Sequence, residues 1–156
     1  MSTLLRRSWS TVWMIFCLVI CSRQQRVEGS GSIKVADFGL AKDIYTSEYY
    51  RSEQRGALPV KWMSPESLLV NYFDEKTDVW SYGVTCWEIF SLGRVPYPGV
   101  GNNNVIVMIK AGKRLDKPVL CPDKLFTLMQ TTWADTPTKR PTFEEIVDTL
   151  EQSILS

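Results

Sequence analysis

The sequence contains no histidine among its 156 residues. Without that residue the chain cannot carry a Ser-His-Asp or Cys-His nucleophile or a histidine-ligated metal, so the hydrolases that are built on these groups are excluded. Surplus charge is almost absent as well, because 18 basic residues stand against 17 acidic ones. The charge balance therefore gives no reason to expect binding to nucleic acid or to an anionic surface.

Cysteine is also scarce, and its spacing indicates no site. The four cysteines match neither a zinc motif nor a disulfide framework, and Cys86 and Cys121 are expected to be reduced thiols in the core. No apolar run reaches the ~20 residues that a membrane-spanning helix needs. The longest one, Val12–Cys21, follows Arg6 and Arg7 and has the length of the hydrophobic region of a signal peptide.

Residues 1–32 therefore admit three interpretations. The preferred one is a signal-like segment with a flexible joint, since its last four residues are Gly-Ser-Gly-Ser. The segment could instead be an apolar strand or helix of the domain, or it could be foreign to the domain, from an alternative first exon or a misassembled gene.

Residues 33–156 form the second unit. The apolar content of 44% and the charged content of 22% are values of a globular protein.

Two short motifs organise this second unit. Asp37–Gly39 closes an alternating segment, Ile33–Ala36, that is expected to form a short strand. Ser64–Glu66 follows about 27 residues later. An Asp-Phe-Gly motif and an Ala-Pro-Glu-type triplet mark the two ends of a protein-kinase activation segment. Their order and spacing indicate such a segment here, with serine where alanine is usual.

The residues around these motifs resemble a receptor tyrosine kinase of the insulin-receptor-like and related animal groups. The resemblance rests on Lys34–Tyr45, on the Tyr-x-x-x-Tyr-Tyr spacing and on Leu58–Met63. It implies that Asp37 binds Mg²⁺ at an ATP site to which Phe38 and Gly39 belong. It also implies a cluster of phosphoacceptors, namely Tyr45, Tyr49 and Tyr50. The loop that seats the substrate tyrosine would consist of Leu58, Pro59, Val60, Lys61 and Trp62.

The sequence after these motifs predicts a helical lobe. Asp74–Ser91 is apolar nearly all round and is expected to be a buried central helix. Shorter helices are expected over Asn103–Ala111 and Cys121–Trp133, and Thr142 forms a capping box with Glu145 before a last amphipathic helix. The predicted fold is a mostly α-helical C-terminal lobe with one short strand, taken from a protein-kinase-like fold that is α+β when complete.

The resemblance also implies structural roles for three polar residues. Arg140 would pair with Glu66 and tie the activation segment to the last helices, while Asp78 would hydrogen-bond the backbone of the catalytic loop. However, the residues before Asp37 include no aspartate, asparagine or histidine and only one lysine, Lys34. The glycine-rich loop, the strand lysine and the catalytic base are thus missing from this sequence. Asp78 is then expected to lack its partners, and the fragment to be marginally stable and prone to aggregate.

The expected function follows from these features. The parent receptor would transfer the γ-phosphoryl group of ATP to protein tyrosine at the cytoplasmic face of the plasma membrane, but this chain alone is expected to be inactive and to bind ATP and Mg²⁺ poorly. Its expected partners are protein substrates and phosphotyrosine-binding proteins, not nucleic acid, with the membrane reached through other parts of the parent. The alternative is a truncated isoform that acts as a phosphotyrosine-bearing interaction or competitor module. A secreted helical domain fits poorly, because the kinase lobe would find no ATP there.

Overall fold

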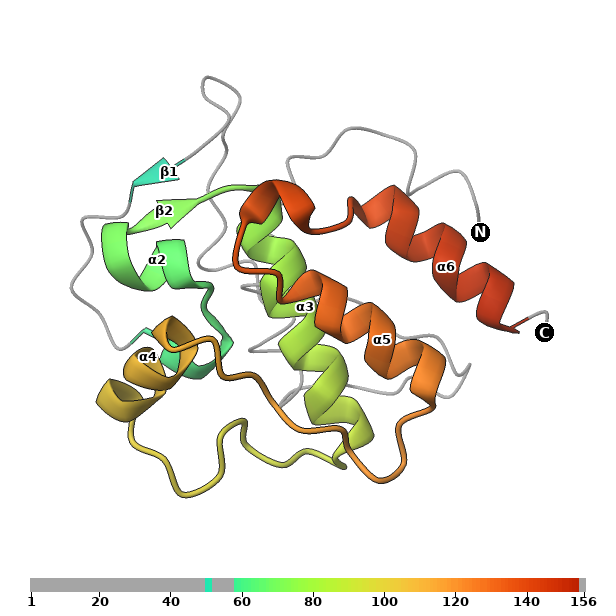
Figure 1. Ribbon diagram of the computed structural model, residues 1–156, viewed down its shortest axis with the longest axis horizontal. Coiled ribbons are helices and arrows are strands. Elements are labelled where there is room, and N and C mark those ends of the chain that lie inside the picture. Colours follow the sequence, from blue (N-terminus) through green and yellow to red (C-terminus); the bar gives the residue numbers. More distant parts are fainter. Residues whose placement is uncertain (1–49, 52–57, 155–156) are drawn as a thin grey trace, which may run out of the picture.

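The computed structural model describes residues 50–51 and 58–154, and helices dominate this part of the chain (Figure 1). The α-helices are α2 (Pro65–Val70), α3 (Glu75–Phe90), α4 (Asn102–Lys110), α5 (Asp123–Thr132) and α6 (Phe143–Ile154). The 3₁₀ helices are η3 (Val60–Trp62) and η4 (Pro137–Lys139), and the strands are β1 (Tyr50–Arg51) and β2 (Tyr72–Phe73). The kinase-like helical lobe predicted from the sequence is confirmed. The strand predicted at 33–36 lies outside the described residues.

Helix α3 lies at the centre of the lobe, with α5 and α6 on one side and α2, α4 and the strands on the other (Figure 1). It begins at a reciprocal cap in which Asp74 Oδ1 accepts from the Thr77 amide at 2.9 Å and Thr77 Oγ1 accepts from the Asp74 amide at 3.1 Å. Side chains from every turn of α3 are buried, as the all-round apolar pattern predicted. Both ends of the helix lie within one residue of the predicted limits, Asp74 and Ser91.

Helices α3 and α5 lie in close contact at Gly83. Gly83 faces Thr132 there, and a Cβ atom added to the glycine would lie 1.9 Å from Thr132 Oγ1 and 2.7 Å from Trp133 Nε1. The missing side chain is therefore what allows the two helices to touch. Around this crossing the main core contains buried side chains of α3, α4, α5 and their connections, among them Trp80, Trp87, Ile109 and Met129.

Helix α6 begins at the capping box that the sequence predicted. The Thr142 amide donates to Glu145 Oε2 at 2.7 Å, and the Glu145 amide donates to Thr142 Oγ1 at 3.2 Å. Its apolar face supplies Ile146 to a smaller buried cluster with Val79 of α3 and Leu128 of α5. The cap and this cluster together fix the last helix against the central one.

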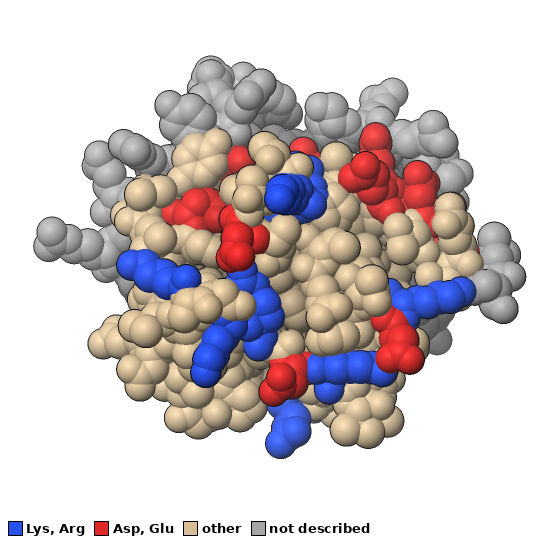
Figure 2. All heavy atoms as spheres, viewed as in Figure 1, with Lys and Arg blue, Asp and Glu red and all other residues tan. Residues whose placement is uncertain are grey.

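The described part of the chain contains no helix that is both long and apolar enough to cross a membrane. On the face drawn in Figure 2, lysine and arginine side chains are interspersed with aspartate and glutamate, and uncharged surface separates the small groups. This face therefore presents no extended field of one sign, in line with the near-zero net charge of +1.

Candidate functional site

The five-residue loop Leu58–Trp62, which the resemblance assigns to substrate binding, is half-buried and fixed to the helical core. Trp62 Nε1 donates to Glu88 Oε2 at 3.1 Å, and the Trp62 carbonyl accepts from Ser81 Oγ at 2.9 Å. Both partners lie on α3. Lys61 Nζ donates to the carbonyl of Tyr97 at 3.2 Å. Three contacts from distant positions thus hold this short segment, whose η3 turn then passes into the Ser-Pro-Glu triplet.

The triplet itself begins helix α2. Ser64 is the N-cap, and its Oγ accepts from the Ser67 amide at 3.3 Å and lies 2.8 Å from Ser67 Oγ. Pro65 occupies the first helical position, where its missing amide hydrogen costs nothing. Serine in place of the usual alanine therefore has a local reason, because it caps α2.

Glu66, in the first turn of α2, meets Arg140 across 74 positions of sequence. Arg140 Nη1 donates to Glu66 Oε1 at 2.6 Å and Nη2 donates to Oε2 at 3.0 Å, in a bidentate arrangement. Arg140 also donates to the carbonyls of Ala134 and Lys76, both at 2.9 Å. The side chain of Arg140 has no solvent exposure, and that of Glu66 is 16% exposed. The expected ion pair is therefore present, and it joins α2, α3 and the segment before α6.

Arg140 is also one of two guanidinium groups that lie over the indole ring of Trp80. Its Cζ is 5.1 Å from the ring centroid, and Cζ of Arg114 is 4.7 Å from it. Trp80 is fully buried. Cation–π attraction in a desolvated place like this one is worth about 2 kcal/mol. The sequence pattern gave no hint of this arrangement, because the three residues are far apart in the chain.

Asp78, on the first turn of α3, is buried without full compensation. It is 5% exposed, and its Oδ2 atom has no hydrogen-bond partner among the residues that the structure describes. Loss of solvation, with smaller contributions from the neighbouring Asp74 and Glu75, raises the pKa of this carboxyl group well above its usual value. The amide groups of a further backbone segment could donate hydrogen bonds to this Oδ2 atom.

The remaining candidate residues lie outside the described part of the chain. These are the Asp-Phe-Gly residues and the first two tyrosines of the cluster: Asp37, Phe38, Gly39, Tyr45 and Tyr49. Of the third tyrosine only the backbone is described, and Tyr50 pairs with Phe73 in the β1–β2 ladder. Among the described residues, no group of three or more Asp, Glu, Cys or His side chains could hold a metal ion.

The partners that anchor the substrate loop were not predicted from the sequence. Glu88 is 5% exposed and lies between apolar residues of α3, and a buried carboxylate requires a donor. This was the available signal, but the sequence did not show that Trp62 supplies the donor.

The two cysteines of the core, Cys86 and Cys121, are free thiols. Burial raises the pKa of Cys86 to about 11, which disfavours the thiolate that a nucleophilic cysteine requires.

Comparison with known proteins places these features in a family. A family model described as protein tyrosine and serine/threonine kinase matches residues 19–150. The chain is 49% identical over 119 residues to the human proto-oncogene tyrosine-protein kinase ROS, with 76% of this chain and 5% of that protein covered. It is 46% identical over 135 residues to the protein sevenless of Drosophila virilis, with 86% and 5% covered.

A third relative belongs to another receptor group. The fibroblast growth factor receptor 1 of Xenopus laevis is 43% identical over 133 residues, with 85% of this chain and 16% of that protein covered. The chain thus spans less than a fifth of the length of each of these three relatives.

Proposed function

This chain belongs to the protein kinase family, as part of the kinase domain of a receptor tyrosine kinase. From that premise we propose that residues 33–156 supply the activation segment and the substrate-binding lobe of an enzyme that phosphorylates protein tyrosine. The γ-phosphoryl group would come from ATP with Mg²⁺. Residues 1–32 would be a separate signal-like or foreign segment, although the match to the family model already begins at residue 19. The complete parent would act at the cytoplasmic face of the plasma membrane.

The observation that carries the proposal is the anchoring of Leu58–Trp62. A phosphoryl-transfer enzyme works mainly by positioning its reactants and stabilising charge, so the surface that seats the substrate must be rigid. Here the loop is fixed to α3 through Glu88 and Ser81, and the triplet that follows it is fixed by the buried Glu66–Arg140 pair. These contacts support a substrate platform whose position is set by the core of the lobe.

The roles of the activation-segment residues belong to the same proposal. Asp37, with Phe38 and Gly39 beside it, would hold Mg²⁺ against the phosphates of ATP. Tyr45, Tyr49 and Tyr50 would accept phosphate and then bind phosphotyrosine-binding proteins, since each phosphate adds nearly two negative charges and strong acceptors. The chain alone would be inactive, because residues 1–36 contain no candidate for the base aspartate or the asparagine ligand.

The test is a chimaera that joins the upstream half of the kinase domain of human ROS to residues 33–156. We expect the chimaera to phosphorylate a tyrosine-containing peptide in an ATP- and Mg²⁺-dependent assay and the chain alone to show no activity. Asp37→Asn should abolish the activity of the chimaera while its circular dichroism spectrum is retained. A folded chimaera without activity, or an active isolated chain, would contradict the proposal.

A second variant tests the substrate platform separately. Trp62→Phe keeps the aromatic bulk but removes the indole donor to Glu88. In the chimaera it should raise KM for the peptide about tenfold or more and leave KM for ATP nearly unchanged. Lys110→Glu, an exposed change at the end of α4, is the matched control and should alter neither constant. Equal effects of Trp62→Phe on both KM values would remove the substrate-binding role from this loop.

A further inference from the structure

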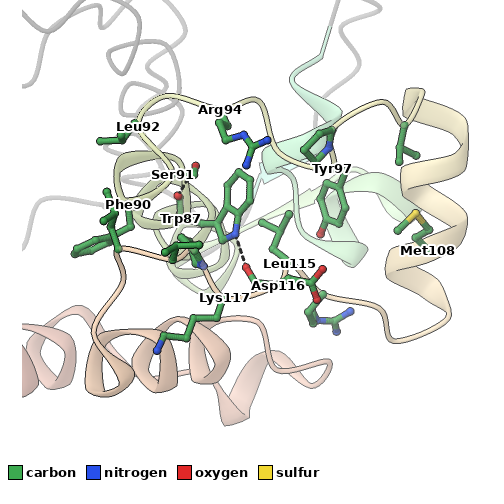
Figure 3. Close-up of a pocket in the computed structure, with 16 residues that line it drawn as sticks. Trp87, Phe90, Ser91, Leu92, Arg94, Tyr97, Met108, Leu115, Asp116 and Lys117 are labelled. Atoms are coloured by element: carbon green, nitrogen blue, oxygen red, sulfur yellow. Dashed lines mark hydrogen bonds between the residues drawn. The ribbon is translucent and has the colours of Figure 1, made fainter.

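A cavity of about 580 Å³ opens between the end of α3, the segment before α4 and the segment that leads to α5 (Figure 3). Its volume is in the range of roughly 300–1,000 Å³ that is typical of ligand pockets. None of its lining residues belongs to the activation segment, the Ser-Pro-Glu triplet or the substrate loop. The cavity is therefore a separate feature of the lobe, although it adjoins the substrate loop at Tyr97, whose carbonyl accepts from Lys61 Nζ.

The walls of the cavity are mainly apolar and are fixed by the fold. The indole of Trp87 stands in the middle of the site in Figure 3, and its Nε1 donates to the carbonyl of Asp116 at 2.7 Å. Phe90 and Leu92 lie on one side of it, with Tyr97 and Met108 on the other. Trp87 is 7% exposed and also belongs to the main core, so the hydrogen bond holds the indole as a preformed aromatic floor of the site.

The charged residues of the lining are predominantly basic, with Arg94, Arg114 and Lys117 against Asp116 alone. Arg114 and Lys117 already form ion pairs, with Asp135 and Asp123 respectively. Arg94 is exposed, has no ion-pair partner among the described residues, and lies at the edge of the cavity near Trp87. The site therefore combines an apolar wall with one unpaired cation, a combination that suits an apolar ligand with an acidic neighbour.

The rim distinguishes a peptide from a small molecule. Leu92 is 80% exposed, Leu120 is 60% exposed and Val119 is 98% exposed, although all three line the cavity. A small ligand inside the cavity would leave these outer side chains in water. An extended chain that crosses the opening would cover them, and contiguous exposed apolar surface of this kind marks protein-interaction sites.

We propose that this cavity binds a peptide segment in which an aromatic or branched aliphatic side chain is flanked by aspartate or glutamate. The apolar anchor enters the cavity against Trp87, and the acidic neighbour pairs with Arg94. The backbone of the segment lies across Leu92 and Val119. This site would give the lobe a docking surface for a protein partner that is distinct from the substrate platform.

The experiment measures binding of a fluorescein-labelled, capped peptide, Glu-Asp-Leu-Phe-Asp-Glu, to the full chain by fluorescence anisotropy. Arg94→Glu and Val119→Asp should each weaken binding about tenfold or more. The matched controls are Lys110→Glu and Val107→Asp, an exposed cation and a 65%-exposed apolar residue of α4 that do not line the cavity. They should change the dissociation constant less than about twofold.

Two further probes separate the possible outcomes. A peptide with both apolar residues replaced by alanine should bind at least about tenfold more weakly, because the anchor and not charge alone is required. Dodecanoate, which has an apolar chain and one carboxylate, tests a small amphiphile as the occupant. The proposal is overturned if the peptide does not bind, if the cavity variants bind it as well as the controls do, if the alanine peptide binds equally, or if dodecanoate alone binds.

Discussion

The side chain of Arg140 has no solvent exposure, so its charge is compensated entirely from within the lobe. Glu66 supplies the opposite charge, two carbonyls accept further hydrogen bonds, and the ring of Trp80 lies 5.1 Å from the guanidinium carbon. Removal of one partner from a buried ion pair is costly because it leaves the other charge uncompensated. The resemblance anticipated the pair with Glu66, whereas the indole and the carbonyls emerged only from the packing.

Glu66→Gln tests this argument at the level of one residue. The substitution keeps the shape of the side chain but removes the negative charge, so we expect the free energy of unfolding of the full chain to fall by about 3–5 kcal/mol. Urea denaturation followed by tryptophan fluorescence measures it. The matched control is Asp135→Asn, which breaks a pair whose acid is 76% exposed and should cost less than about 1 kcal/mol. Similar losses for the two variants would show that burial does not strengthen the Glu66 pair.

Asp78 leads to a prediction about pH. Burial is the main reason that the pKa of Asp78 is raised in the folded chain. Between the usual pKa of an aspartate, 3.8, and this higher pKa, the carboxyl group is protonated in the folded state and ionised in the unfolded state. The contribution of Asp78 to stability is therefore greatest below pH 3.8 and is lost as pH rises through the higher folded pKa. Asp78→Asn removes the titration, and at pH 7 it should raise the free energy of unfolding by about 1–3 kcal/mol.

The measurement is urea denaturation of both proteins at several pH values. The difference between Asp78→Asn and the unchanged chain should grow with pH through the interval in which Asp78 ionises. Asp148→Asn, at an exposed position of α6, serves as the control and should show no such growing difference. A constant difference across the pH range would argue that Asp78 has the same pKa in both states.

At the scale of elements, the sequence predicted α3, α4, α5 and α6 with ends close to those observed, whereas it did not predict α2 or the two 3₁₀ helices. Helices α3 and α6 carry their own signals, an all-round apolar pattern in one and a capping box in the other, so their presence and limits followed from local residues. Helix α2 has six residues and depends on the cap at Ser64 and on the distant pair made by Glu66. The pairing of β1 with β2 likewise joins segments that show no strand pattern. Elements fixed by tertiary contacts could not be predicted from local sequence.

The same distinction holds for the candidate site. The residues of the substrate loop and the Glu66–Arg140 contact came from motifs, which are contiguous in sequence. The anchoring of Trp62 by Glu88 depends on how η3 packs against α3, and no local pattern encodes that geometry.

Gly83→Ala tests the helix crossing. In a helix interior, alanine is more favourable than glycine by roughly 0.5–1 kcal/mol, so propensity alone predicts stabilisation. The new methyl group would lie 1.9 Å from Thr132 Oγ1, however, and both residues are buried. We expect a net loss of about 1–3 kcal/mol or more in urea denaturation, because overpacking forces α3 and α5 apart.

Thr132→Ala provides the companion variant for this crossing. It removes Oγ1, the atom nearest to the added methyl group, so the double variant should lose less than the sum of the two single changes. Additive losses would indicate that the helices separate by another route and that Oγ1 is not the limiting contact.

At the scale of the whole molecule, two features of α3 suit a lobe that packs against a further segment: Asp78 Oδ2, which has no hydrogen-bond partner among the described residues, and the side chain of Ile89, which is 53% exposed. An unsatisfied buried acceptor and exposed apolar surface both lower stability and favour association. We therefore expect the isolated chain to bind a hydrophobic dye and to unfold at lower urea concentration than the chimaera with the upstream half of the kinase domain. A sharp transition of the isolated chain at the midpoint of the chimaera would contradict this.

The direction in which Asp78→Asn changes the free energy of unfolding tests whether an upstream segment packs on Asp78 or whether the isolated chain is unstable for a general reason. In the chimaera, the upstream half would supply backbone donors to Asp78, and a carboxylate that accepts such bonds is favoured in its charged form. Asp78→Asn should then destabilise the chimaera by about 1–3 kcal/mol at pH 7, although the same change stabilises the isolated chain. Paired urea denaturation curves give both values. If the substitution changes stability in the same direction in both proteins, Asp78 does not receive backbone donors from the upstream segment.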